Sequence, residues 1–111
     1  MLLTVITVVL NNEDYLRRFL ESALKTEFLD VEFLIVDGFS VDGSFDLAAT
    51  FSLQDSRIRA LRVKDSGIFD AMNFGITQAK GDFLTFVNSD DFLLPDRFDS
   101  VCKNVLLNAN R

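Results

Sequence analysis

The chain has 111 residues, which suits a single domain with a buried core. Apolar residues make up 49% and charged residues 25%, a balance that is typical of a globular protein and argues against disorder. A net charge of −6 disfavours nonspecific nucleic-acid binding, and the lack of histidine excludes imidazole catalysis and His-ligated zinc. The single cysteine, Cys102, can form no disulfide within the chain.

Short apolar runs alternate with segments of helical periodicity in the first half of the chain. Leu2–Leu10 is a continuous β-branched run without a basic start, which predicts a buried strand and neither a signal peptide nor a membrane helix. Asn12 is the predicted N-cap of a helix. A second strand is predicted at Val31–Val36 and a second helix at Ser44–Leu53. The apolar stripe of the first helix comprises Tyr15, Leu16, Phe19, Leu20, Ala23 and Leu24.

The second half continues the same alternation. Strands are predicted at Ile58–Val63 and Phe83–Val87, and helices at Ile68–Ala79 and from Pro95 onward. The apolar side of the third helix comprises Ile68, Met72, Ile76 and Ala79. That of the last helix comprises Phe98, Val101, Cys102, Val105 and Leu106. The order βαβαβαβα predicts a parallel sheet with right-handed crossovers and helices on both faces, an α/β three-layer sandwich formed by one domain over residues 1–111.

Polar or acidic residues follow every predicted strand. In open parallel sheets ligands bind beyond the carboxyl ends of the strands, so Asp37, Asp90 and Asp91 are expected to converge at one edge. Two carboxylates about 4 Å apart repel by about 4 kcal/mol at an effective dielectric near 20. Without histidine or a thiolate cluster, the natural relief is Mg²⁺ or Mn²⁺ bound by oxygens. The alternative is that Asp90 and Asp91 only cap the turn into the last helix.

Several other nucleotide-binding classes lack their signatures here. The residues after the first strand read LNNEDY and not GxGxxG, and GxxxxGK[ST] is absent, so neither a dinucleotide fold nor a P-loop is indicated. A receiver domain would need an acidic pair after the first strand, where Asn11 and Asn12 stand. That interpretation stays open as a minor one.

Three segments in order, ITVVLNNEDYLRRFLESAL, EFLIVDGFSVDGSFDLA and DSGIFDAMNFGITQAKGDFLTFVNSDDFLLP, resemble glycosyltransferase family 2. The resemblance is strongest to the branch that makes bacterial polysaccharides and carries D-x-G-[IV]-[YF]-D-A-M-N-x-G. It runs from about Thr4 to Asp96. It implies the Rossmann-like nucleotide-diphospho-sugar transferase fold, called GT-A, of which this chain would be the amino-terminal, donor-binding half.

The resemblance also implies roles for particular residues. Asp37 would accept the ring N–H of the nucleotide base, and Asp65, Gly67 and Asn73 would lie beside the donor nucleotide. Asn73 and Gly75 have an alternative role, which is to let the third helix pack closely. Asp70 in the same segment is as readily an N-cap or a surface charge.

The segment Asn88-Ser89-Asp90-Asp91 matches the family's D-x-D-type motif. By this resemblance Asp90 would hold the divalent metal, Mn²⁺ or Mg²⁺, on the diphosphate. Asn88 would meet the ribose through an amide where many members have a carboxylate, and Asp91 would support the nucleotide-sugar site.

The activity implied is an inverting, hexosyl-type transfer from a nucleotide diphosphate sugar, with a UDP-sugar expected, to a saccharide or lipid-linked hydroxyl in surface polysaccharide synthesis. We expect a cytoplasmic protein, with peripheral contact with the inner face of the membrane left open. The chain ends at Arg111, soon after the metal motif, and offers no general base; that base is expected beyond Arg111. With strand order 3-2-1-4 the fourth strand would be an exposed apolar edge able to form a homodimer. The alternative function is a non-catalytic, truncated homologue that binds a nucleotide sugar or a partner.

Overall fold

The computed structural model describes residues 1–64 and 67–108, and it contains eight elements in the predicted order within those ranges. The elements are β1 (Leu3–Val9), α1 (Glu13–Leu24), β2 (Val31–Asp37), α2 (Ser44–Gln54), β3 (Ile58–Arg62), α3 (Ile68–Gln78), β4 (Phe83–Phe86) and α4 (Pro95–Asn108). The predicted boundaries are therefore correct to within one residue wherever they were specified. Pro95 is the first residue of α4, where its fixed φ suits a helix start.

The four strands form one parallel sheet in the order β3-β2-β1-β4, which confirms the α/β fold class. Every residue of β2 is buried, as expected for a strand covered on both faces. In this sheet β4 pairs with β1 alone, so its other edge has no neighbouring strand among the described residues.

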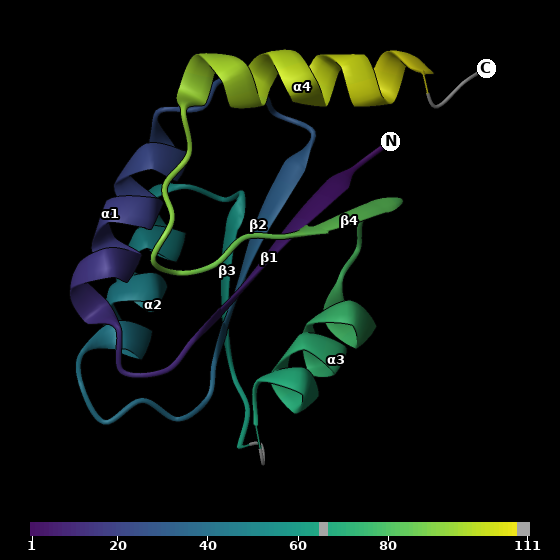
Figure 1. Ribbon diagram of the computed structural model, residues 1–111. Helices are drawn as coiled ribbons and strands as arrows, with labels where there is room; N and C mark the ends of the chain where they lie inside the picture. The colour runs from purple at the N-terminus through teal and green to yellow at the C-terminus, as the bar shows by residue number, and fades with distance from the viewer. Residues whose placement is uncertain (65–66, 109–111) are drawn as a thin grey trace.

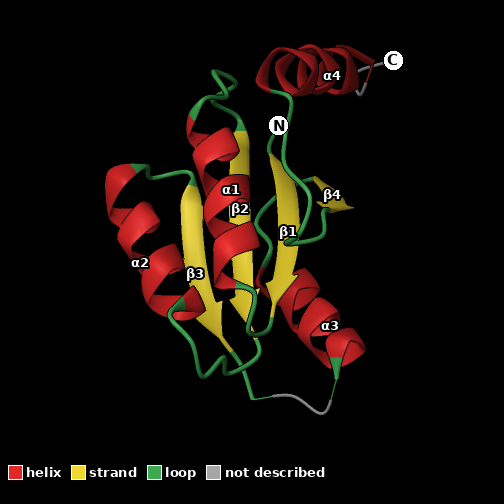
Figure 2. Cartoon of the chain, turned by 60° about the vertical axis from the view of Figure 1, so that its left-hand side comes forward, coloured by secondary structure: helices red, strands yellow, loops and turns green. Residues whose placement is uncertain are grey.

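The helices form layers on the two faces of the sheet (Figure 1, Figure 2). α1 and α2 lie side by side on one face, and α3 covers β1 and β2 on the other. α4 crosses the amino ends of the strands, at the top of both views. The Asp99 carboxylate fixes α4 there by accepting hydrogen bonds from the backbone N–H groups of Glu27 and Phe28, at 2.9 and 3.0 Å.

The larger hydrophobic core fills the space between the sheet, α1, α2 and α4. The rings of Phe19 and Phe33 meet edge to face at 6.3 Å, and Phe33 also contacts Phe98 at 5.7 Å. Two predicted members of apolar faces do not belong to it, because Tyr15 is 50% and Val101 59% exposed. Each lies at the border of its stripe, on the solvent side. The Leu106 side chain, predicted on the same face of α4, is outside the described part.

The predicted apolar side of α3 is wrong for Ile68 and Ile76, whereas Ala79 packs against the smaller apolar cluster as predicted. Ala71 and Gly75 are buried against the sheet, whereas Ile68 and Ile76 are 56% and 44% exposed. A Cβ at Gly75 would lie 2.8 Å from Cγ2 of Ile6, so α3 approaches β1 more closely than any side chain would allow. The packing role of Gly75 is therefore confirmed. The small residues Ala71 and Gly75 face the sheet because of this close approach, and Ile68 and Ile76 are displaced to the exposed flanks.

No helix within the described ranges has the length and apolar character needed to cross a membrane.

Candidate functional site

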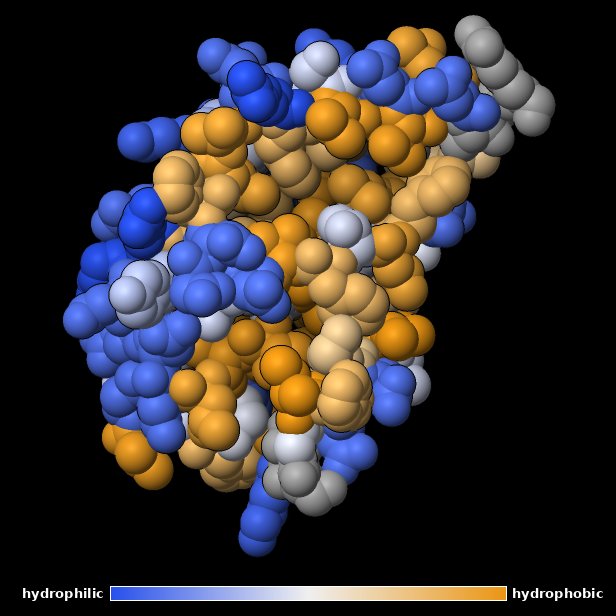
Figure 3. Space-filling view, in the orientation of Figure 1, coloured by the Kyte–Doolittle hydropathy of each residue, from blue (hydrophilic) through white to orange (hydrophobic). Residues whose placement is uncertain are grey.

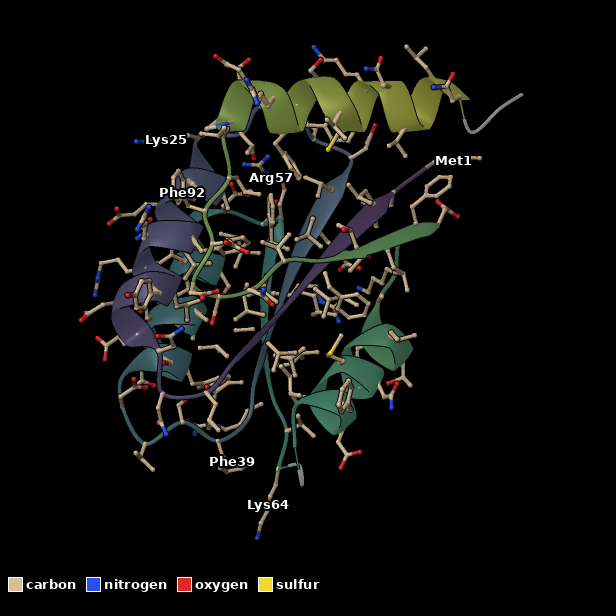
Figure 4. All side chains as sticks on the ribbon, in the orientation of Figure 1. Met1, Lys25, Phe39, Arg57, Lys64 and Phe92 are labelled. Atoms are coloured by element: carbon tan, nitrogen blue, oxygen red, sulfur yellow. The ribbon has the colours of Figure 1, made fainter. Side chains whose placement is uncertain are left out.

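The carboxyl ends of the parallel strands meet at one edge of the sheet, at the lower end of the molecule in Figure 1. Phe39 and Lys64, which follow β2 and β3, lie at this end in Figure 4. The turns after β1, β2 and β4 also come together here, through the hydrogen bonds described below. The sequence prediction that polar strand ends share one edge is thus confirmed in topology.

Backbone and side-chain hydrogen bonds hold the turn after β1 against the turn after β2. The N–H of Asn11 donates to Oγ of Ser40 at 2.8 Å, and the Asn11 side-chain oxygen accepts from the N–H of Val41 at 2.7 Å. The N–H of Gly38 donates to the carbonyl of Val9 at 3.0 Å. Asn11 adopts a left-handed φ of 51°, which its short polar side chain tolerates. These bonds fix the floor of the candidate site.

Asp37 is fully buried, and its carboxylate is hydrogen-bonded to other residues of the chain. Its carboxylate accepts hydrogen bonds from the N–H and the hydroxyl of Ser40 and from Nε of Arg62, the last at 3.2 Å. The Arg62 guanidinium stacks between the rings of Phe39 and Phe45, at 4.9 and 4.5 Å from their centroids. The prediction that Asp37 joins other acids at the open edge is therefore wrong, because Arg62 and Ser40 hold its charge inside the protein.

The loop after β4, residues 88–91, is called the motif loop; its two aspartates are exposed and its serine is buried. Asn88, Asp90 and Asp91 are exposed, whereas Ser89 is buried. The side-chain nitrogen of Asn12 donates to Oγ of Ser89 at 3.1 Å. Asn12 does occupy the N-cap position of α1 as predicted, but its side chain makes no capping hydrogen bond. It joins the start of α1 to the motif loop instead.

The chain that follows the motif is fastened to the far end of α1. The Arg18 guanidinium lies over the ring of Phe92, 4.1 Å from its centroid, and the N–H of Leu93 donates to Oγ of Ser22 at 2.9 Å. In Figure 4, Phe92 lies beside α1. The motif loop is therefore anchored on both sides, and α1 supplies both anchors.

Asp42 provides a fixed negative charge where α1 and α2 begin. Its carboxylate accepts hydrogen bonds from the backbone N–H groups of Ser44, at 2.9 Å, and Glu13, at 3.3 Å. Hydrogen bonds from Ser44 lower the pKa of Asp42 below its ordinary value, and the bond from the Ser44 side chain has a larger effect than the bond from its backbone N–H. Helix amino ends favour such a charge, so Asp42 serves the two helices and is not a candidate general acid.

A pocket of about 320 Å³ opens at the carboxyl edge. It lies between the ends of β1 and β2, the start of α3 and the motif loop. Its described lining consists of Val8, Val9, Leu10, Gly38, Gly67, Ile68 and Ser89. It combines a segment from the predicted donor region with one from the predicted metal motif, which lie more than 20 residues apart in the chain. This is the strongest candidate for a ligand site at the edge.

The prediction that three acids share a cation is wrong for the part of the chain that the structure describes. Within residues 1–64 and 67–108, no three acidic or thiol side chains are grouped so that they could hold a metal. Asp90 is nevertheless an exposed carboxylate beside the pocket-lining Ser89. A hard cation bound by one or two carboxylates takes its other ligands from water and phosphate oxygens. The single exposed carboxylate of Asp90 fits a cation bound in this way.

The other predicted site residues divide into three groups. Gly67 lines the pocket, as the resemblance implies. Asn73 is exposed on α3 and Asn88 is exposed after β4, and neither belongs to the described pocket lining. Asp65 lies outside the described residues.

Sequence reasoning missed three residues of this edge, Arg62, Ser89 and Phe39. Arg62 ends β3 within a mixed pattern that carries no functional signal, and only the fold brings it to Asp37. Ser89 was passed over as the middle residue of the motif. Phe39 was also missed; it is half-exposed and holds a left-handed φ of 67°, which is uncommon for a bulky residue and marks strain at this turn.

Comparison with known proteins gives consistent results. The family model "Glycosyl transferase family 2" matches residues 4–106. Glycosyltransferase GlyA of Streptococcus pneumoniae serotype 4 is 33% identical over 104 residues, covering 94% of this chain and 15% of the relative. Glycosyltransferase GlyG of the same strain is 32% identical over 105 residues, covering 94% and 35%. The succinoglycan biosynthesis protein ExoO of Rhizobium meliloti is 35% identical over 95 residues, covering 85% and 27%.

Solved structures share the fold. The S. aureus TarS fragment 1–349 in complex with UDP-GlcNAc superposes with a TM-score of 0.84 at 24% identity, covering 93% of this chain and 30% of that one. The mannosyltransferase PcManGT of Pyrobaculum calidifontis, in complex with GDP-Man and Mn²⁺, gives 0.78 at 19% identity, covering 91% and 31%. The chain thus spans only about a third or less of the length of these proteins. The match over residues 4–106 nevertheless covers most of it, and the chain belongs to glycosyl transferase family 2.

Proposed function

We propose that this chain binds a nucleotide diphosphate sugar, with a UDP-sugar expected, at the carboxyl edge of the sheet. The protein would transfer the sugar to a hydroxyl of a saccharide or lipid-linked acceptor in surface polysaccharide synthesis, on the cytoplasmic side of the membrane. The observation that carries this proposal is the pocket between Gly67 and Ser89, which joins the two segments expected to meet the donor. Family membership, and the UDP-GlcNAc bound by TarS, support it.

Each predicted residue has a proposed role at this site. Asp90 would hold Mn²⁺ or Mg²⁺, and the exposed Asn88 and Asp91 would flank it, with Asn88 toward the ribose. When bound, the cation supplies positive charge that stabilises the diphosphate as the glycosidic bond breaks. Gly67 leaves room for the donor at the start of α3, since among the described residues no atom outside its own neighbours and helix backbone lies within 4 Å of where its Cβ would be.

The remaining predicted residues would act around the nucleotide. Asp65, which precedes α3 in the sequence, and Asn73, which lies on α3, would contact the donor nucleotide. Asp37 would recognise the base; because its carboxylate is fully buried and bound to Ser40 and Arg62, contact with a base N–H would require that turn to shift.

Transfer itself requires a carboxylate that deprotonates the acceptor, and we nominate no residue of this chain for it. We propose that the base and the acceptor site belong to sequence beyond residue 111, and that transfer inverts the anomeric configuration. The chain alone would then bind the donor and show little or no transfer.

Isothermal titration of UDP into the chain, with and without Mn²⁺ or Mg²⁺, tests the proposal. Binding should strengthen on adding metal, and Asp90→Asn should remove that gain. Asp96→Asn is the matched control, because Asp96 is also exposed but lies in the first turn of α4 at the opposite end of the molecule. An absence of binding to both UDP and GDP with either metal would reject the proposal.

The alternative, a module that recruits a partner without catalysis, has one supporting observation. The free edge of β4 carries Leu84 and Phe86, both of which are substantially exposed. Figure 3 shows apolar surface over β4 and α3. A second copy pairing along this edge would form a homodimer. Sedimentation analysis should then show a dimer that Leu84→Lys converts to a monomer; a monomeric wild-type chain counts against it.

A further inference from the structure

Ser89 has a singular position in the candidate pocket. Of the residues that the structure describes in the lining, it alone has a polar side chain, and the other six are apolar residues or glycines. It is only 9% exposed, so what remains of its surface faces the pocket that it lines. Pockets for small ligands depend on a few such polar groups to orient the ligand.

The hydrogen bond from Asn12 determines what Ser89 can do. The Nδ2 group of an asparagine only donates, so Oγ of Ser89 is the acceptor in this 3.1 Å bond. A serine hydroxyl also has one proton to donate. Among residues 1–64 and 67–108, no group accepts that proton in a hydrogen bond. The Ser89 hydroxyl therefore has a proton available to donate to a ligand.

Asn12 gives up a favourable interaction to make this bond. An asparagine at an N-cap usually accepts a hydrogen bond from its own helix, an interaction worth about 1 kcal/mol. Here the Asn12 side chain makes no such bond to α1. The backbone N–H of Asn12 separately donates to Oγ of Ser44 at 3.3 Å. The Asn12 side chain is thus oriented toward Ser89 and not toward its own helix, as expected of a residue that positions the Ser89 hydroxyl.

We propose that Ser89 is a further ligand-contacting residue, which donates its hydroxyl proton to an oxygen of the nucleotide diphosphate, and that Asn12 is the positioning residue that leaves this proton available. The inference rests on the function proposed above. Phosphate oxygens accept hydrogen bonds but never donate them, and they would otherwise meet the nearby carboxylates of Asp90 and Asp91. A neutral donor at this point offsets that repulsion without adding charge.

Two substitutions remove the donated proton in different ways. Ser89→Ala deletes the hydroxyl. Asn12→Asp keeps the shape and the capping ability of residue 12, but its carboxylate accepts the Ser89 proton and so withdraws it from the ligand. Each should weaken UDP binding in the presence of Mn²⁺ by about tenfold, as expected for one hydrogen bond to a charged group. The loss in the double variant should be smaller than the two single losses combined, because both changes act on the same proton and only the charge added at residue 12 contributes separately.

Three controls separate this role from a structural one. Ser52→Ala removes a hydroxyl from α2 that bonds only the Ala49 carbonyl, and it should leave UDP binding unchanged. Uridine, which lacks phosphates, should bind equally to wild type, Ser89→Ala and Asn12→Asp. The midpoint of thermal unfolding of Asn12→Asp should match or exceed that of wild type.

The outcomes are distinct. Wild-type UDP affinity in Ser89→Ala would overturn the inference while leaving the proposed function intact. Wild-type affinity in Asn12→Asp, or equal losses for uridine and UDP, would overturn the assigned proton and the phosphate contact. A wild-type chain that binds no UDP would reject the proposed function and this inference together.

Discussion

Replacing Glu32 by glutamine would remove a buried charge that holds three strands and a loop together. Glu32 lies on β2, is 5% exposed, and accepts hydrogen bonds from the Thr4 hydroxyl on β1 at 2.7 Å and the N–H of Lys80 at 2.6 Å. Nη1 of Arg59 on β3 completes the set at 2.7 Å. Burial raises the pKa of Glu32, but the bonds from Thr4, Lys80 and Arg59 outweigh it and hold the pKa below its ordinary value.

The expected loss in the free energy of unfolding is about 2 kcal/mol at pH 7. Breaking a fully buried ion pair costs roughly 3–5 kcal/mol. We reduce that figure because the Arg59 side chain is 27% exposed and water screens the charge left there. A glutamine also retains one acceptor oxygen, so part of the hydrogen bonding to Thr4 or Lys80 survives.

The pH dependence gives the prediction its sign. A carboxyl whose pKa is lower in the folded state stabilises the protein above its unfolded pKa, ordinarily 4.5, and this contribution disappears as the pH falls through the lowered value. Urea unfolding followed by circular dichroism should therefore show that the free energy of unfolding of Glu32→Gln is well below that of wild type at pH 7. This difference should become smaller below pH 4.5. Glu21→Gln, on the exposed surface of α1, is the control and should change little. A difference that is absent at pH 7, or that stays constant into acid, would refute the reasoning.

Three more predictions concern single side chains. Oγ1 of Thr7 is buried and has no hydrogen-bond partner among the described residues, so Thr7→Val should raise the free energy of unfolding by about 1 kcal/mol in urea titrations, and a loss of stability would contradict it. Gly75→Ala would place a methyl 2.8 Å from Cγ2 of Ile6 and should lower the free energy of unfolding by about 1–3 kcal/mol; an unchanged midpoint would show that α3 can move away freely. Burial, and secondarily the charge of Asp99, raises the pKa of the Cys102 thiol to about 11, so at pH 8 iodoacetamide should label it slowly in the native chain and quickly in urea. Equal labelling rates would disagree with its burial.

The order of elements could be predicted because it depends on local periodicity. The β-branched run of β1 and the 3.6-residue pattern of α1 each select one backbone conformation without help from the rest of the chain. Once the order βαβαβαβα is known, handedness and parallel pairing leave few arrangements, and all of them bring the strand ends to one edge. The edge at which the candidate site lies could therefore be predicted from the sequence, and the resemblance identified the family of the chain.

The sequence could not predict which side chains remain available at that edge. Asp37 was expected to join other acids at the open edge, but Arg62, its register partner on the neighbouring strand β3 and 25 residues further along the chain, binds its carboxylate inside the protein. Asn12 was expected to cap α1, but Ser89, 77 residues away, takes its amide. Such pairings depend on the positions of strand ends in space, which no local pattern encodes.

The face that α3 presents to the sheet shows the same division. The sequence determined by itself that residues near 68–79 form a helix, because helical conformation follows from local propensity and periodicity. Only the tertiary structure decided that Gly75 and not Ile76 meets β1, since that choice depends on how closely two backbones can approach. Conformation along the chain is a short-range property, whereas burial and the pairing of charges depend on contacts between segments distant in sequence. That is why the sequence could predict the edge that holds the candidate site, whereas only the tertiary structure determined which side chains line the pocket there.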